Sequence, residues 1–219
     1  MPCTRAAVLI MLSFKLIYAD KYYLPIGEHV FPAQKYRLIA QELIVNRVAT
    51  NEDFLTPEPA RDADILLVHT PEWVCKLTTG TLSPREELLM EIPYSRDLVQ
   101  AFWLAAGGSI LAARCALRDR VGISIGGGFH HAFPDHGEGF CMIHDVAVAV
   151  RWIRDLNAAG LDDKQVELGI PSAEYRLPVL EGAPGSEGAQ RLQLPRVQMR
   201  ESDRISGCDR GVHVITAHT

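Results

Sequence analysis

Two adjacent histidines, His130 and His131, follow a short β-branched segment that runs into three glycines. Residues 121–125 are typical of a buried strand, and the glycines at 126–128 allow the backbone to turn sharply where it ends. Ligand sites in parallel sheets gather at the carboxyl ends of the strands. Imidazole titrates near neutrality, so a pair of histidines at this point is suited to general acid–base catalysis.

Two other interpretations of these histidines stay open. In the first, one histidine is buried and hydrogen-bonded while its neighbour caps another element. In the second, five side chains form a metal cluster: His130, His131, His136, Cys141 and His144. Cys141 and His144 have the spacing of half a metal site, but no complementary half follows, which argues against the cluster.

The elements that position the pair alternate along the first two thirds of the chain. A first strand is predicted at 14–18, and helices are predicted at 32–48, from Pro71 to Gly80, from a capping box at Ser83, at 95–118 and at 145–159. On the helix at 32–48, Tyr36, Ile39, Leu43 and Ile44 share one face. The helix at 95–118 is apolar almost all round, which is typical of a buried helix. Strands alternating with helices predict a parallel sheet covered on both faces.

Composition sets further limits on function. The net charge of −5 argues against a nucleic-acid partner bound by phosphate neutralisation, whereas a cationic ligand suits the acidic balance. The five cysteines are odd in number and irregularly spaced, so we expect a reducing compartment and a cytoplasmic location. We interpret residues 1–13 as an extension rather than a signal peptide, and we expect no membrane-spanning run.

The character of the chain changes after Gly160. Residues 161–219 contain one aromatic residue, Tyr175, and scattered Gly, Pro, Ser, Arg and Glu without periodicity. Residues 165–170, where the next buried strand belongs, have a poor composition for a central strand. We therefore divide the chain into a domain at 14–160 and a weakly ordered tail at 161–219.

The string around the histidines extends further than the pair. Gly-Gly-x-His-His-Ala ends at Ala132, and Gly-Phe-Cys-x-x-x-Asp-Val-Ala-Val-Ala begins at Gly139. Upstream, the chain reads Tyr-Leu-Pro from Tyr23, His-Val-Phe-Pro from His29 and Val-His-Thr-Pro-Glu-Trp-Val from Val68. Together these motifs resemble the histone deacetylase and acetylpolyamine amidohydrolase superfamily, in particular its small bacterial, class IV-like branch. The resemblance covers about residues 14–159.

This resemblance implies a fold and roles for single residues. It implies the α/β, three-layer arginase–deacetylase parallel sheet, here truncated after the histidine loop and the following helix. It implies zinc-dependent hydrolysis of acetyl-lysine or acetylpolyamine amides, with His131 as general acid–base and His130 as its electrostatic partner. Gly139 and Phe140 would line the acyl-lysine tunnel.

For the residues that follow in the motif, the resemblance implies structural roles. Cys141 would be a buried thiol and Asp145 an N-terminal helix cap. His144 stands where the family has asparagine, so we expect it to contact solvent or the loop.

The zinc ligands of the family have no counterpart in the sequence. The family carries an Asp-x-Asp-x-His-x-Gly string on the next strand, but no histidine follows Asp162 and Asp163 at that spacing, and the segment from Asp209 to His213 lacks the second aspartate and the glycine. We therefore assign no metal ligands and predict an inactive chain, because two histidines alone hold zinc weakly.

Two alternatives to an enzyme stay open. The chain is either a non-catalytic remnant that binds a partner or a truncated or frame-shifted product without a role of its own. A sheet that ends early would also leave the helix at 95–118 partly uncovered and would favour self-association.

Overall fold

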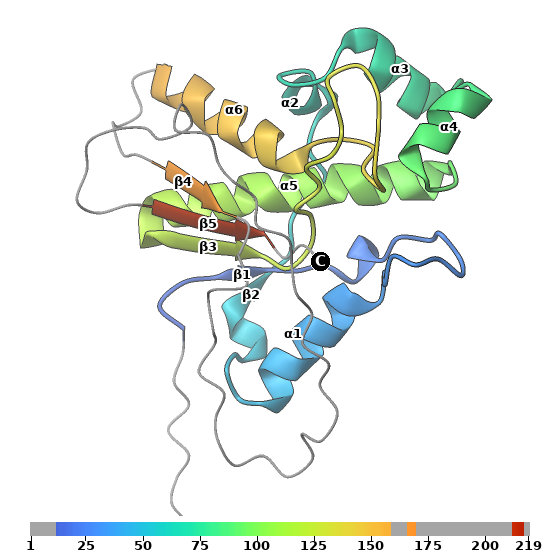
Figure 1. Ribbon diagram of the computed structural model, residues 1–219. Helices are drawn as coiled ribbons and strands as arrows, with labels where there is room; N and C mark the ends of the chain where they lie inside the picture. The colour runs from blue at the N-terminus through green and yellow to red at the C-terminus, as the bar shows by residue number, and fades with distance from the viewer. Residues whose placement is uncertain (1–11, 159–165, 170–211, 217–219) are drawn as a thin grey trace, which may run out of the picture.

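The computed structural model describes residues 12–158, 166–169 and 212–216 (Figure 1). Five parallel strands form one sheet in the order β2-β1-β3-β5-β4. The strands are β1 (Leu16–Ile17), β2 (Phe54–Leu55), β3 (Val121–Ser124), β4 (Val166–Gly169) and β5 (Val212–Thr216). The prediction of a central parallel strand at 121–125 is confirmed, since β3 lies between β1 and β5 and pairs with both.

Helices cover the two faces of this sheet. Helices α5 (Arg96–Asp119) and α6 (Asp145–Ala158) lie on one side and α1 (Lys35–Val45) lies on the other (Figure 1). The remaining elements are α2 (Asp62–Ile65), α3 (Pro71–Thr79), α4 (Pro84–Met90) and the short 3₁₀ helices η1 (Asp20–Tyr22) and η2 (Asn51–Asp53). The arrangement is the predicted three-layer α/β fold.

Local sequence sets the starts of helices α3, α4 and α5. The hydroxyl of Thr70 accepts a hydrogen bond from the N–H of Trp73 at the start of α3. Ser83 and Glu86 form the predicted capping box of α4, and the Ser95 hydroxyl caps α5. Each cap satisfies a backbone N–H group that has no partner inside its own helix.

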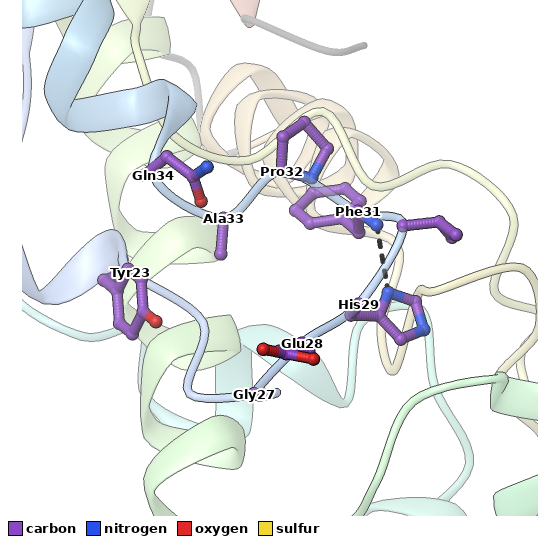
Figure 2. A pocket seen from close by; sticks show the side chains of 9 residues that line it. Tyr23, Gly27, Glu28, His29, Phe31, Pro32, Ala33 and Gln34 are labelled. Carbon is purple, nitrogen blue, oxygen red and sulfur yellow. Dashed lines mark hydrogen bonds between the residues drawn. The ribbon is translucent and has the colours of Figure 1, made fainter.

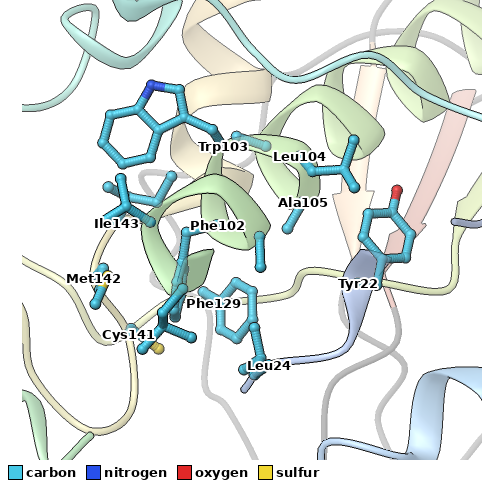
Figure 3. Packing of buried hydrophobic residues seen from close by; sticks show 14 of the residues in the cluster. Tyr22, Leu24, Phe102, Trp103, Leu104, Ala105, Phe129, Cys141, Met142 and Ile143 are labelled. Carbon is cyan, nitrogen blue, oxygen red and sulfur yellow. The ribbon is translucent and has the colours of Figure 1, made fainter. Parts of the chain in front are cut away.

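Helix α5 is the central element of the core. A side chain at Gly122 of β3 would overlap the carbonyl oxygen of Ala112, so this glycine allows the strand to approach the helix backbone closely. Near the histidine loop, the rings of Phe102 on α5 and Phe129 lie 4.4 Å apart between centroids (Figure 3). Leu24 and Cys141 pack beside them and are buried.

Two expectations about α5 need correction. By length and composition alone this helix could cross a membrane, contrary to the expectation from the sequence, and 83% of its apolar window is buried inside the protein. Such burial is typical of a core helix. The expected partly uncovered surface is also wrong, because α6 and the sheet pack against α5. The burial of α5 therefore gives no reason to expect self-association through this helix.

Helix α1 presents a different face to the core from the predicted one. Tyr36 and Ala40, four residues apart, are buried, and Leu43 is partly buried next to them. Ile39 and Ile44, predicted to share this face, are exposed. Small Ala40, rather than a large apolar residue, lies in the line of contact, and a pattern based on large apolar side chains misses it.

Two strands lie in the segment after Gly160. β4 falls within the window at 165–170 and takes the edge of the sheet, where a poor central strand can be accommodated. β5, whose sequence Val-His-Val-Ile-Thr is β-branched, pairs with both β3 and β4 and was not predicted. The remaining positions of the predicted tail lie outside the described residues.

Candidate active site at the histidine loop

The glycine turn after β3 makes room for a buried carboxylate. Gly127 and Gly128 have φ values of 86° and 82°, in the left-handed region that favours glycine. A side chain at Gly127 would overlap a carboxylate oxygen of Asp145, the first residue of α6. The glycines therefore allow the backbone to turn here and leave room for the Asp145 side chain.

Asp145 connects the turn to two helices. Its carboxylate accepts hydrogen bonds from the backbone N–H groups of Phe129, at 2.7 Å, and Gly128, at 3.1 Å, and from the hydroxyl of Ser109 on α5. The side chain has no exposed surface, and burial raises its pKa to about 6. This differs from the expected N-terminal cap, because the carboxylate binds the loop and α5.

His144, immediately before α6, caps the helix in its place. Its Nδ1 accepts a hydrogen bond of 3.1 Å from the N–H of Ala147, which fixes the hydrogen of the neutral ring on Nε2. Its own N–H donates to Nε2 of His69, a buried histidine, at 2.9 Å. Burial and the nearby His130 and His69 lower the pKa of His144 to about 4. The expected contact with solvent or the loop is thus replaced by a helix cap.

The two candidate catalytic histidines lie past the carboxyl end of β3 with their rings together. The ring centroids of His130 and His131 are 4.2 Å apart and the planes are inclined by 34°. Nδ1 of His130 is 3.0 Å from the carbonyl oxygen of Gly128. A carbonyl only accepts, so Nδ1 donates, and a neutral His130 has its lone pair on Nε2.

His131 is held mainly in its neutral form. Partial burial lowers its pKa from 6.5, and the neighbouring His130 lowers it further, while the carboxylates of Glu138 and Glu91 act in the opposite direction. A neutral imidazole can accept a proton at pH 7, which is what a general base requires. The catalytic roles of both histidines remain predictions.

Gly139 and Phe140 form the tip of a tight turn beside His131. Glu138 and Cys141 exchange both backbone hydrogen bonds, and the two residues between them have positive φ values, 53° and 66°. Positive φ at both central positions is the requirement of a type I′ turn, where an aromatic residue is unusual. A side chain at Gly139 would come within 3.2 Å of the His131 ring. The turn thus places Gly139 against the His131 ring, and Phe140 is the next residue of the turn.

A pocket of about 380 Å³ lies inside the loop between η1 and α1 (Figure 2). Tyr23, Glu28, His29, Phe31 and Gln34 are among its lining residues. The ring of Phe31 lies 6.2 Å from that of Phe140, so one wall of the pocket adjoins the histidine loop. A concavity shared by the histidine pair and Phe140 stays a prediction.

Lys35, at the start of α1, is a half-buried cation that sequence reasoning did not single out. Its Nζ lies 4.1 Å from the centroid of the Phe31 ring and 5.0 Å from that of Tyr36. It has no hydrogen-bond partner in the described part of the chain, and burial lowers its pKa to about 8. The available signal was a lysine spaced between aromatic residues, a pattern that suits cation–π contacts.

The side chains described do not fit a zinc ion. Among residues that the structure describes, no three His, Cys, Asp or Glu side chains are grouped so that they could hold a metal. The histidine pair offers two nitrogens, whereas a catalytic zinc normally has three protein ligands. Asp162, Asp163 and Asp209 lie outside the described residues.

Comparison with known proteins shows the family to which the chain belongs. The histone deacetylase domain matches residues 29–161, and the chain belongs to this family. An uncharacterized protein of Picosynechococcus is 37% identical over 149 residues, which are 68% of this chain and 50% of that protein. Histone deacetylase 2 of Arabidopsis thaliana is 27% identical over 68% of this chain and 43% of its own length. The acetoin utilization protein AcuC of Bacillus subtilis is 29% identical over 63% of this chain and 39% of its own length.

Solved structures show the same fold. A histone deacetylase homologue complexed with SAHA has a TM-score of 0.57 at 24% identity, and the homologue from Aquifex aeolicus has a TM-score of 0.59 at 22% identity. Each comparison covers 72% of this chain and 44% of the solved one. The chain therefore spans about half the length of the relatives that it matches, and the fold prediction is confirmed over that part.

Proposed function

We propose that the histidine loop is the proton-transfer and acyl-binding part of a deacetylase site for acetyl-lysine or acetylpolyamine amides. The observation that carries this proposal is the His130–His131 pair, whose ring centroids are 4.2 Å apart, with Phe140 on the adjacent turn. His131, neutral at pH 7, would accept the proton of an attacking water and return it to the leaving amine. His130, whose Nδ1 donates to Gly128, would direct Nε2 toward the reacting group.

The charges near the pair suit a cationic substrate. The carboxylates of Glu91 and Glu138 are close enough to His131 to act on its pKa, and Glu28 lines the neighbouring pocket. An acetylated polyamine retains ammonium groups, and acetyl-lysine in a basic peptide has cationic neighbours. Carboxylates at the mouth of a site raise the local concentration of such ligands.

We further propose that this chain alone does not hydrolyse its ligand. In the best-known zinc enzymes, the metal lowers the pKa of its bound water from 15.7 to about 7. The sequence has no Asp-x-Asp-x-His string to hold the ion, and that string would also contribute the carboxylates that orient the histidines in the family. The chain should therefore bind an acetylated amine without turning it over.

Two measurements on the purified chain test the proposal. The first is hydrolysis of an acetyl-lysine peptide with added zinc, alongside a metal analysis of the protein. We expect neither turnover nor stoichiometric zinc. Turnover that His131→Ala abolishes and His136→Ala retains would overturn the proposed inactivity, because it would show that ligands come from another part of the chain.

The second measurement addresses binding. NMR titration with Nε-acetyl-lysine methylamide should shift the imidazole signals of His130 and His131 and leave those of His136 in place. His136 is a suitable control because it stacks on Phe133, with centroids 4.6 Å apart, outside the pair. Equal shifts at all three rings, or none, would refute the assignment of the acyl site.

A further inference from the structure

His29, in the loop that precedes α1, uses both ring nitrogens. Its Nδ1 accepts a hydrogen bond of 3.0 Å from the N–H of Phe31 (Figure 2), and its Nε2 lies 2.9 Å from the carbonyl oxygen of Glu91. A backbone N–H only donates and a carbonyl only accepts, so Nδ1 must have the lone pair and Nε2 the hydrogen. The ring is therefore held in one tautomer and one orientation.

The end of α4 holds the His29 ring and the Phe140 backbone with consecutive carbonyls. The oxygen of Met90 accepts from the N–H of Phe140 at 2.9 Å, and the oxygen of Glu91 accepts from His29. The last carbonyls of a helix have no partner within the helix and need donors from elsewhere. Glu91 has a φ of 57°, which ends the helix at this point. His29 and Phe140 are thus fixed to one rigid point.

The two rings also meet directly. The centroids of His29 and Phe140 are 5.1 Å apart with planes at 86°, which is an edge-to-face contact. The ring centroid of Phe31, whose backbone N–H donates to His29, lies 6.2 Å from that of Phe140, so Phe31 contacts the Phe140 ring as well. A left-handed backbone at Phe140, with a φ of 66°, persists only where the surroundings determine it strongly. His29 supplies one such contact from 111 positions earlier in the sequence.

We infer that His29 is a positioning residue that fixes the orientation of the Phe140 ring, on the turn adjacent to His131, and so determines how tightly the site holds the stem of an acylated amine. This inference rests on the proposed function of the same site. Phe140 offers a flat wall to an alkyl stem only if the ring stays in one orientation. The side chain that fixes the orientation therefore contributes to affinity without a contact to the reacting atoms.

Two variants of His29 separate its contacts. His29→Ala removes the ring and both hydrogen bonds. His29→Gln loses the ring contact with Phe140 but keeps an amide donor that can reach the Glu91 carbonyl. His136→Ala is the matched control, because that imidazole lies on the same loop as the pair and stacks on Phe133 instead. Thermal unfolding of each variant shows whether the fold is retained.

The direct readout is ¹⁹F NMR of 4-fluorophenylalanine placed at position 140 of the full chain. We expect His29→Ala to shift and broaden the signal, His29→Gln to do so less, and His136→Ala to leave it unchanged. An unchanged signal in His29→Ala would overturn the inference. Because this measurement needs no ligand, it decides the positioning role even if the proposed function fails.

The second readout is the affinity for Nε-acetyl-lysine methylamide. An edge-to-face pair contributes enough to change binding by about 3- to 10-fold, so we expect a loss of that size in His29→Ala, with partial recovery in His29→Gln and less than 2-fold change in His136→Ala. Equal affinity in His29→Ala and the unsubstituted chain would refute the effect on binding. Absence of binding by the unsubstituted chain would refute the proposed function and with it the role in affinity.

Discussion

The carboxylate of Asp145 accepts a 2.7 Å hydrogen bond from the backbone N–H of Phe129, the residue before the histidine pair. Gly128 and Ser109 donate to the same carboxylate, so the loop, α6 and α5 meet at one buried group. The position of the loop that carries His130 and His131 therefore depends on this buried carboxylate. A motif residue can hold the geometry of a site without taking part in its chemistry.

Substitution of Asp145 by alanine tests this dependence. The change would leave two buried N–H groups without an acceptor, each of which costs about 1–3 kcal/mol. We expect the free energy of unfolding in urea to fall by roughly 2–4 kcal/mol. Asp135→Ala is the control, since that exposed carboxylate pairs with His136 and should leave unfolding unchanged. Equal effects of the two substitutions would contradict the role of Asp145 in the loop.

The backbone of Phe140 gives a second prediction. Its φ of 66° suits glycine, and an L-residue in the left-handed region loses roughly 1–2 kcal/mol. Phe140→Ala and Phe140→Gly both remove the ring, but only glycine relieves the backbone. We expect Phe140→Gly to be about 1 kcal/mol more stable to urea than Phe140→Ala, by the lower end of that range. An alanine variant of equal or greater stability would show that the turn is not left-handed at this position.

The elements around the site could be predicted because local residues specify them. Thr70 with Pro71, and Ser83 with Glu86, cap their helices by contacts within a few residues. The glycines after β3 specify the turn for the same reason. Long-range contacts could not be predicted: nothing near His29 in the sequence indicates that Phe140 is its neighbour. Motif spacing places side chains along the chain, whereas tertiary packing decides which of them touch.

Strand order illustrates the same limit. β5 lies between β3 and β4 in the sheet, yet 87 residues separate it from the end of β3, and it follows a stretch without periodicity. The parallel pairing of Val121 with His213 is a non-local contact that local pattern cannot indicate. For α1, small Ala40 took the place expected for Ile39 or Ile44. Predictions based on large apolar residues fail where a helix packs so closely against its neighbours that only a small side chain fits.

The coupling between the two histidines gives a third prediction. His130 lowers the pKa of His131 in addition to the effect of burial, because two imidazolium rings at a centroid distance of 4.2 Å repel each other. We expect His130→Gln to raise the pKa of His131, as followed by NMR titration of its ring proton. Replacement of His136 by glutamine should leave the titration as it was. A pKa of His131 that is the same with and without His130 would show that burial alone causes the shift.

The last prediction concerns the effect of His144 on the free energy of unfolding at acid pH. Its pKa is about 4 in the folded chain and 6.5 as an ordinary value, so between these pH values the unfolded chain binds the extra proton. Its contribution is fully present above about pH 6.5 and is lost as pH falls toward 4, by up to about 3 kcal/mol. His144→Asn keeps a cap acceptor for the N–H of Ala147 but does not titrate.

Urea unfolding of both proteins between pH 7.5 and 4.5 should show a smaller acid loss in His144→Asn. Asp145 has the opposite effect on stability, because its raised pKa of about 6 lets the folded chain bind a proton at a higher pH than the unfolded chain does. His69 and His131, whose pKa values are lowered, destabilise the folded chain in acid as His144 does. These three groups are the same in both proteins, so the difference between the two curves reports His144. Curves that stay parallel throughout this pH range would show that His144 is not buried as a neutral cap.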